Sequence, residues 1–503
     1  MVTDRDHKHV KMGALQHQRI GGGFGRVDGD VRVSSVHPKI AQSEMNLQPH
    51  QMRAVLSILK RPKFALLHPP GAGKTLTAIV SIECLLADHP NTALYERWKQ
   101  DRSRYRHRED VPPAPKRPVV VGLFPAGLIT NFLQGVDKYG RKDLNSIQRD
   151  YRLFSFEHAA SPKHFPQLLE LCKDAILVVD EVQTLRTAVQ KTRDAGAKRT
   201  RASKTGLTLH AAKSAVELDL NPSDCTSGKK AAALLALRKV ARHVILLSGS
   251  SLVNKVGDIH TVARILAPNE AEFLQVFPTS KSMDGKFTED QHRALNAALI
   301  GNLSYITPAE LDRSQFPTVT EHLVVLEMDP DYAAEYTRIE KGELKKTKDG
   351  TGVDIKRMID GGRSASKIDA AGCFYNGLRR ASNTMGPLCD SRKRAFLMNK
   401  AREIANKRQS MTIASNYREY GIHSLVTELK ELKIQFDEVS GEIKKDDRTL
   451  VVKAYNAGKL DVLLLTLGAG GVGLDLKGTR MHCNFEPVII AHLCRFCWLI
   501  MVI

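Results

Sequence analysis

The sequence predicts an α/β protein built on parallel β-sheets, and three stretches of the chain predict it. Residues 64–67 are a short apolar run that leads through a glycine-bearing turn into residues 76–86, an apolar stretch typical of a helix. Residues 176–179 are four consecutive apolar residues, the pattern of a central parallel strand buried on both faces. Residues 411–417 begin another strand-helix pattern much later in the chain.

The turn after the first strand has the composition of a phosphate-binding loop. It contains Gly71, Ala72, Gly73, Lys74 and Thr75 between a strand and a helix, as such loops require. Glycines allow backbone N–H groups to turn toward a phosphate at the positive end of the helix. Lys74 is then expected to reach the β- and γ-phosphates, and the Thr75 hydroxyl to hold Mg²⁺.

One position departs from the usual phosphate-loop pattern. That pattern, G-x-x-x-x-G-K-[ST], begins with a glycine, and His68 occupies the place. A bare G-x-G-K-T also arises by chance in ordinary loops. The assignment of this segment as a phosphate-binding loop therefore depends on a second motif elsewhere in the chain.

The partner motif follows the apolar run at 176–179. Asp180 and Glu181 come directly after it, and carboxylates at the carboxyl end of a parallel strand stand in the ligand crevice of an α/β sheet. We expect Asp180 to hold Mg²⁺ through water and Glu181 to polarise the attacking water. The alternative is a strand that ends in a solvated acidic turn. Together the two motifs predict an NTPase that uses ATP and Mg²⁺.

Composition adds an expected partner. The chain has 503 residues, enough for two to four domains, and 75 Lys and Arg against 55 Asp and Glu, a net charge of +20. A soluble NTPase this basic most often binds nucleic acid. A protein that is merely basic throughout is the alternative.

The cysteines suggest a reducing compartment. Eight cysteines are scattered without a disulfide framework, and the first twenty residues are too polar for a cleavable signal sequence. We expect an intracellular protein, with nucleus, cytoplasm and virion left open. Cys494 and Cys497 form one C-x-x-C, with His482 and Cys483 upstream, but no second pair completes a zinc site.

Three segments look peripheral to the core. Residues 1–45 are polar and glycine-bearing, and we expect them to be flexible. Residues 96–117 have 8 Lys and Arg against 4 acids, and residues 187–230 have 9 against 4. Both are expected to be surface insertions between core elements, and an ordinary solvated face is the alternative for each.

Further blocks follow in a fixed order and carry a resemblance. Together with the two motifs above, the chain resembles superfamily 2 helicases and translocases, closest to Snf-type ATPases and the related transcription ATPases of large DNA viruses. The resemblance runs from about residue 46 to 478 and is weakest in residues 270–390. The further blocks are residues 119–132, 244–254, 411–417, 439–441, Arg448, 455–456 and 461–478.

The resemblance assigns roles to residues around the nucleotide. Gln51 resembles the adenine-reading glutamine ahead of the phosphate loop, which matches motif I. Asp180 and Glu181 match motif II, where Gln183 replaces the histidine of relatives. ATP and Mg²⁺ are the cofactors that these matches imply.

Two later motifs imply coupling between nucleotide and nucleic acid. Ser248, Gly249 and Ser250 stand where relatives have T-G-T of motif III; Ser251 replaces the following proline, and Asn254 matches the family's asparagine. Residues 469–476 match motif V. Its coupling residues are Gly470, Gly471, Gly473 and Asp475, the last in place of asparagine.

Motif V also overlaps a dinucleotide-binding pattern. Residues 468–473 fit G-x-G-x-x-G after a strand, the fingerprint of a dehydrogenase. That fingerprint requires a helix to begin there, but residues 474–478 run straight into another glycine. We therefore disfavour this reading.

The predicted architecture is two RecA-like domains with parallel sheets. The first spans residues 46–275, a mainly helical connector spans 276–390, and an incomplete second domain spans 391–503. The implied function is ATP-driven movement along nucleic acid, with DNA expected over RNA, in transcription, replication or remodelling. A hydrolysis-impaired nucleic-acid-binding remnant and a P-loop NTPase of another class remain alternatives.

The C-terminal tail departs most from the family pattern. Relatives carry a Q-x-x-G-R-x-x-R block whose arginines stabilise the transferring phosphoryl group. Here Arg495 is the only arginine in residues 488–503 and is the candidate arginine finger. The segment is too short and polar for a membrane span. We expect a truncated or altered end of a longer gene rather than an anchor, and slow ATP hydrolysis weakly coupled to nucleic acid.

Overall fold

The computed structural model describes the greater part of two α/β domains. The described residues are 47–102, 111–139, 144–185, 189–190, 222, 225–249, 256–283, 285–307, 310–311, 320, 322, 324, 326–340, 380–385, 391–470, 474 and 476–485. The segment 1–45, most of the insertion 187–230 and the tail beyond residue 485 lie outside these residues.

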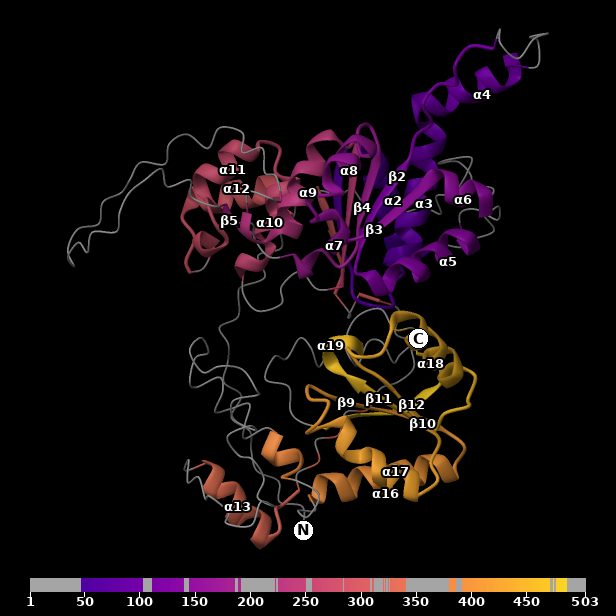
Figure 1. Cartoon of the computed structure of the whole chain (residues 1–503). Coiled ribbons are helices and arrows are strands. Elements are labelled where there is room, and N and C mark those ends of the chain that lie inside the picture. Colours follow the sequence, from indigo (N-terminus) through magenta and orange to yellow (C-terminus); the bar gives the residue numbers. More distant parts are fainter. Residues whose placement is uncertain are drawn as a thin grey trace, which may run out of the picture. The chain divides into compact units, whose positions relative to one another are not determined.

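The first domain is built on a six-stranded sheet in which every pairing is parallel (Figure 1). The strand order is β3-β2-β4-β7-β1-β8. The strands are β1 (Lys63–Leu67), β2 (Val120–Phe124), β3 (Tyr151–Ser155), β4 (Ile176–Val179), β7 (His243–Ser248) and β8 (Leu303–Tyr305).

The central strands are buried on both faces. In β4, Leu177 and Val179 pack into one apolar cluster, while Ile176 and Val178 pack into another. Because successive side chains of a strand point to opposite faces, a continuous apolar run serves both clusters. The predicted parallel α/β sheet is therefore confirmed.

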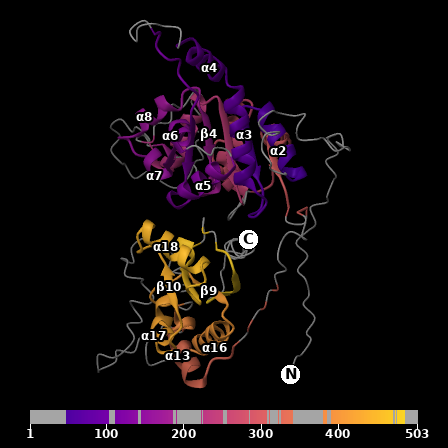
Figure 2. The ribbon, with the colours of Figure 1, turned by 90° about the vertical axis from the view of Figure 1, so that its right-hand side faces the viewer.

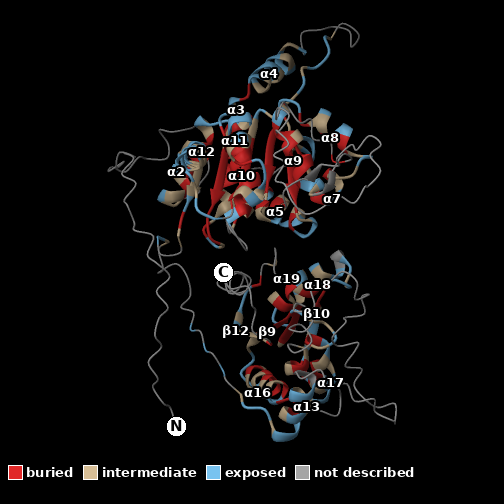
Figure 3. Ribbon diagram, turned by 90° about the vertical axis from the view of Figure 1, so that its left-hand side faces the viewer, coloured by how far each residue is buried: buried red, intermediate tan, exposed pale blue. Residues whose placement is uncertain are grey.

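Helices supply the other half of each cluster. One face is covered by α2 (Pro49–Lys60), α3 (Lys74–Asp88), α5 (Ile129–Tyr139) and α6 (Leu144–Asp150) (Figure 2). The other is covered by α7 (Phe156–Ala159), α8 (Phe165–Leu171), α9 (Lys229–Val240) and α10 (His260–Leu266) (Figure 3). The helix α4 (Pro90–Arg102) follows α3 and has no buried residue.

The apolar core of the first domain continues past residue 275. Phe277, Met283 and Ala298 are buried in the same cluster as β4, and β8 pairs with β1. These residues belong to the 276–390 stretch, for which a connector was expected. They follow α11 (Glu270–Val276) and include α12 (Glu289–Leu299). Farther along, α13 (Pro330–Glu340) is joined to the second domain, because Arg392 Nε donates to Asp329 Oδ1 at 2.8 Å.

The second domain has a four-stranded parallel sheet with order β10-β11-β9-β12. The strands are β9 (Ser410–Ser415), β10 (Phe436–Val439), β11 (Val462–Thr466) and β12 (Thr479–Asn484). The helices are α16 (Arg392–Asn406), α17 (Val426–Glu431), α18 (Lys445–Asn456) and α19 (Leu467–Gly470). Successive residues of β11 again enter two different clusters.

Short elements complete the description. Strands β5 (Val189–Gln190) and β6 (Cys225–Ser227) form an antiparallel pair. Single 3₁₀ turns are η3 (Ala126–Leu128), η4 (Val182–Thr184), η6 (Val256–Ile259), η7 (Ser280–Met283) and η10 (Ile422–Leu425). None of the helices within the described ranges has both the length and the apolar character that a membrane crossing needs.

The two-faced burial of β1 leads to a stability prediction. Leu66 is 0% exposed, so Leu66→Ala should lower the free energy of unfolding of the first domain by about 2–5 kcal/mol, through lost burial and an unfilled cavity. Leu144 on α6 is 64% exposed, and Leu144→Ala is the control, expected within about 0.5 kcal/mol of the parent. Denaturant unfolding followed by circular dichroism measures both; equal losses would contradict this account of the core.

Candidate nucleotide-binding site

The three central strands bring their carboxyl ends to one edge of the sheet. β7 lies between β1 and β4. Leu67 of β1 is level with Ser248 of β7, and Val179 of β4 is level with Leu246. The loop after β1 and the acidic pair after β4 therefore flank the end of β7, at the edge where α/β sheets bind ligands.

Glycine is required in the loop that joins β1 to α3. Gly71 and Gly73 have φ angles of 81° and 77°, in the left-handed region that favours glycine. A Cβ at Gly73 would lie 2.1 Å from Nε2 of Gln51. The helix begins at Lys74, two residues earlier than the apolar pattern predicted, and the strand–loop–helix order is as expected.

Lys74 turns back onto its own loop. Its Nζ donates hydrogen bonds to the carbonyl oxygens of His68 at 3.0 Å and Pro69 at 3.4 Å. Burial lowers the pKa of Lys74, while the negative charges of Glu181 and Asp180 act to raise it. The predicted lysine and both predicted carboxylates thus interact electrostatically in one place.

The carboxylates are the other half of this charge group. Asp180 is half-buried, and the loss of water around its carboxyl group raises its pKa to about 7. The negative charge of Glu181 raises the pKa of Asp180 further, whereas the positive charge of Lys74 lowers it. Glu181 has a φ of 52°, and its backbone N–H donates to Asp180 Oδ1 at 2.9 Å. Thr75, the other predicted Mg²⁺ ligand, is half-buried in the first turn of α3.

Gln51 holds the loop. Its Nε2 donates to the carbonyl oxygen of Ala72 at 3.1 Å, and its Oε1 accepts the backbone N–H of Gln48 at 2.9 Å. His50 Nε2 lies 3.0 Å from the same Ala72 oxygen. The residue expected to read adenine therefore contacts the phosphate loop from α2.

Motifs II and III are joined by side chains. Gln183 Nε2 donates to Glu181 Oε2, and the Ser248 hydroxyl donates to Gln183 Oε1 at 2.6 Å. Gln183, which stands where relatives have histidine, thus connects the acidic pair to the end of β7. Sequence reasoning identified the replacement but not this bridge. Gly249 is described next to Ser248, whereas Ser250 lies outside the described residues.

His68 is a part of the site that sequence reasoning did not assign. It is 0% exposed, and its Nε2 lies 2.8 Å from Ser304 Oγ on β8. Its ring packs edge-to-face against His50, with centroids 5.8 Å apart. The loop is therefore tied to β8, a strand that the sequence pattern did not predict. The available signal was a histidine between an apolar strand and two prolines.

Motif V is only partly described. Gly470 ends α19, whereas Gly471, Gly473, Asp475 and the candidate finger Arg495 lie outside the described residues. The residues that follow the motif are held by α18, since Asn456 Oδ1 accepts the backbone N–H of Lys477 at 2.7 Å. β12 begins at Thr479, which leaves no length for the helix that a dinucleotide fingerprint needs.

His482 is the histidine of the C-terminal His/Cys group, and its ring lies among polar side chains of the second domain. His482 Nδ1 lies 2.7 Å from Thr412 Oγ1, and its Nε2 lies 3.1 Å from Asn484 Oδ1, so both ring nitrogens have polar partners. Cys494 and Cys497 fall outside the described residues. Within the ranges that the structure describes, no three His, Cys, Asp or Glu side chains gather as a metal site.

Comparison with known proteins identifies the second domain. Residues 393–491 match the family described as the helicase conserved C-terminal domain. A protein of Acanthamoeba polyphaga mimivirus, described as an ATP-dependent RNA helicase, is 28% identical over 254 residues, which are 49% of this chain and 54% of that protein. The resemblance to superfamily 2 helicases is confirmed. The chain spans about half the length of this viral relative.

Other helicase-like proteins are more distantly similar. The DNA repair protein RAD5 of Yarrowia lipolytica is 35% identical over 97 residues, which are 19% of this chain and 9% of RAD5. The Sulfolobus solfataricus SWI2/SNF2 ATPase core in complex with dsDNA shares 15% identity and a TM-score of 0.35, over 88% of this chain and 82% of that one. The Pyrococcus furiosus Hef helicase domain shares 13% identity and a TM-score of 0.42, over 90% and 93%.

The buried His68 leads to a pH prediction. Burial, followed by the charges of His50 and Lys74, lowers the pKa of His68 from 6.5 to about 4. As the pH falls below about 6.5, the unfolded state binds the proton before the folded state does, so His68 destabilises the fold progressively down to about pH 4. Above pH 7 this contribution is absent.

His68→Asn should remove this component. Thermal unfolding of parent and variant from pH 4 to 8 measures it, with the other histidines common to both proteins. The stability of the parent relative to the variant should be constant above pH 7 and fall steadily toward pH 4. A difference that does not change with pH would show that His68 is not held neutral by burial.

Proposed function

We propose that this chain is an ATP-dependent helicase or translocase of superfamily 2, which hydrolyses ATP to move along nucleic acid. The observation that carries the proposal is the meeting of Lys74, Asp180 and Glu181 at the edge of the sheet beside a glycine-dependent loop. The helicase C-terminal match supports the class. The net charge of +20 supports a nucleic-acid partner, for which we propose DNA.

The residues present fit ATP and Mg²⁺. Gly73 has a φ of 77° and leaves no room for a Cβ beside Gln51, so only glycine fits where the loop enters the N-terminus of the 15-residue helix α3, and the backbone N–H groups at such a terminus can bind phosphate. Thr75 and Asp180 would hold Mg²⁺, which commonly keeps several waters and takes few protein ligands. The bound cation would supply charge compensation for the phosphates.

The catalytic roles follow from the contacts. Lys74 would exchange the carbonyls of His68 and Pro69 for phosphate oxygens. Glu181 would accept the proton of the attacking water, and Gln183 orients its carboxylate through Oε2. The link from Ser248 to Gln183 connects motif III to the Glu181 carboxylate through the Gln183 side chain.

Coupling to nucleic acid is assigned to the remaining motif residues. Ser248, Gly249 and Ser250 would report the nucleotide state, and motif V, with Gly470, Gly471, Gly473 and Asp475, would contact the nucleic-acid backbone. Arg495 is the candidate arginine finger. Transcription or replication machinery is the proposed setting.

Two variants separate phosphate binding from turnover. Lys74→Ala should abolish tight MgATP binding, because a phosphate cation is lost. Glu181→Gln should retain binding and reduce turnover by at least about 100-fold, because general-base catalysis contributes about 10²–10⁴-fold. Lys281→Ala and Glu289→Gln are exposed controls and should behave as the parent.

Equilibrium binding of a fluorescent ATP analogue and steady-state phosphate release, with and without nucleic acid, measure these effects. Parent-like hydrolysis by both site variants would overturn the ATPase assignment. Nucleotide binding without turnover in the parent would favour the hydrolysis-impaired alternative. Turnover that no nucleic acid stimulates would favour an NTPase of another class.

The bridge through Gln183 has its own test. Gln183→Leu removes both hydrogen bonds at similar size and should lower kcat about 10- to 100-fold, since a hydrogen bond to a charged group is worth about 1.5–3 kcal/mol. ATP affinity should be nearly unchanged. Gln183→His restores the residue of relatives, and its ring can bridge the same partners, so kcat should largely recover. Equal loss in both variants would argue against a bridging role.

A further inference from the structure

The helix α4 is unusual among the long helices of the first domain because it has no buried residue. A short helix in water gains little from its own hydrogen bonds, and tertiary packing normally supplies its stability. Figure 3 shows α4 in the colours of exposed and intermediate residues, apart from the buried layers. Leu94 is 54% exposed and the Lys99 side chain 67% exposed.

Four side chains instead form a ladder in which two neighbouring rings lie between two guanidinium groups. The Arg117 guanidinium lies over the Tyr95 ring, 4.2 Å from its centroid, and the Tyr95 and Trp98 centroids are 5.5 Å apart. The Arg102 guanidinium lies over the other ring, 5.8 Å from the Trp98 centroid. Tyr95, Trp98 and Arg102 are spaced by three and four residues, so they share one face of the helix.

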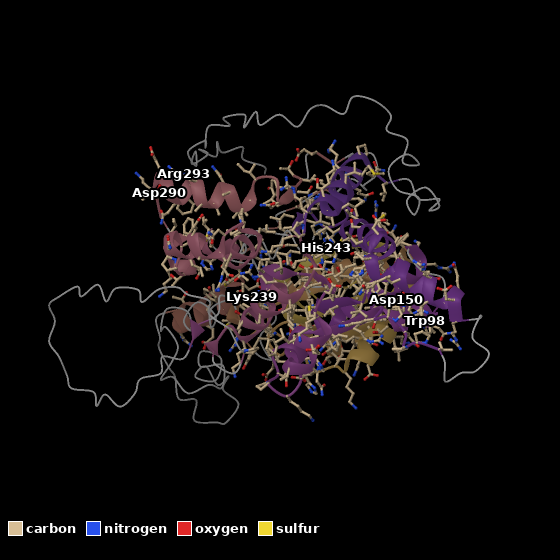
Figure 4. All side chains as sticks on the ribbon, turned by 90° about the horizontal axis from the view of Figure 1, so that it is seen from above. Trp98, Asp150, Lys239, His243, Asp290 and Arg293 are labelled. Carbon is tan, nitrogen blue, oxygen red and sulfur yellow. The ribbon has the colours of Figure 1, made fainter. Side chains whose placement is uncertain are left out.

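One end of the ladder contacts the rest of the domain through Arg117, and Trp98 joins the two segments of chain that carry the ladder. Trp98 Nε1 donates to the carbonyl oxygen of Pro112 at 2.7 Å, which holds the returning chain against α4. Arg117 Nε lies 3.6 Å from Asp150 Oδ1, at the junction of α6 and β3. Figure 4 shows Trp98 and Asp150 on the same side of the domain. We call residues 90–102 and 111–117 the α4 arm.

The arm is basic and lies far from the phosphate loop. It carries five Lys and Arg against two acidic residues. Arg97, Lys99, Arg102 and Lys116 are all exposed. The loop is at the start of α3 and the arm follows its end, and the 15 residues between them make about 22 Å of helix.

We propose that the α4 arm binds single-stranded nucleic acid at a surface separate from the nucleotide site; this rests on the proposed function. Exposed cations neutralise phosphates, and unpaired bases stack on planar groups such as the exposed Arg102 guanidinium and the half-exposed Trp98 ring beneath it. In a duplex the bases are stacked on each other, so a duplex would contact only the cationic side chains of the α4 arm, through its phosphates. The arm lacks the continuous apolar face that a membrane-surface helix buries.

The charges are tested by matched substitutions in the full chain. The arm variant Arg97→Gln/Lys99→Gln/Arg102→Gln/Lys116→Gln is compared with Lys239→Gln/Lys281→Gln/Lys286→Gln/Arg293→Gln, four exposed cations elsewhere on the same domain. Lys239 and Arg293 lie well away from Trp98 in Figure 4. Both variants have the same net charge, so a general charge effect cancels.

Anisotropy of a labelled oligothymidylate from 50 to 200 mM salt is the readout. The slope of log K against log salt should become less steep by up to about 3 in the arm variant, because each phosphate contact on a single strand contributes about 0.7. The control should keep the parent slope. Equal slopes in the two variants would overturn the proposal. So would equal competition by polyglutamate or duplex DNA, because both lack unpaired bases.

Stacking is tested through the only two tryptophans, Trp98 and Trp498. In Trp498→Phe the remaining Trp98 fluorescence should be quenched when the oligonucleotide is added. Trp98→Leu should weaken binding about 5- to 100-fold, as expected for one stacked base. Trp98→Phe keeps a ring but loses the bond to Pro112, so it should bind within a few-fold of the parent. Unchanged Trp98 fluorescence at saturation would exclude stacking.

The arm and the proposed function fail in different ways. ATP turnover without nucleic acid should be the same in the arm variant, the control and the parent, because the arm lies away from the phosphate loop. If the parent binds no nucleic acid at all, the proposed function fails. If the parent binds and the arm variant binds equally well at every salt concentration, only the arm proposal fails.

Discussion

The partial withdrawal of Lys74 and Asp180 from water, at one edge of a parallel sheet, is the constraint on which the candidate site depends. A buried charge costs several kcal/mol unless opposite charges and hydrogen bonds compensate it. The opposite charges of Lys74 and of Asp180 and Glu181 supply that compensation, and loop carbonyls accept hydrogen bonds from Lys74. These charges lie close together only if the strands β1, β4 and β7 keep their register. Burial of the strands on both faces of the sheet fixes that register.

The phosphate loop is held by hydrogen bonds within the protein. Lys74 bonds loop carbonyls, while Gln51 and His50 converge on Ala72. These bonds hold glycines in left-handed conformations that an isolated loop would not keep. A nucleotide bound as proposed would replace some of these bonds, so its net affinity would be the free energy of its own interactions with the loop less that of the hydrogen bonds it displaced.

Much of this arrangement could be predicted from local patterns. The run at 176–179 and the acidic pair after it are contiguous, so their placement at a strand end follows from the chain itself. The glycine loop was predictable because strand, loop and helix are sequential. The bridge through Gln183 to Ser248 was not, since its partners are 65 residues apart and meet only when β4 and β7 pair.

The sequence by itself determined the α/β class, the glycine loop between β1 and α3, and the acidic strand end, because each rests on residues adjacent in the chain. Only the tertiary structure decided that β8, from a stretch without a strand pattern, completes the first sheet beside β1. The three residues of β8 are too few to show a periodic pattern in the sequence, and they form a strand because they pair with β1. That pairing in turn places Ser304 against His68. A contact across 236 residues depends on the packed sheet and cannot be read from local sequence.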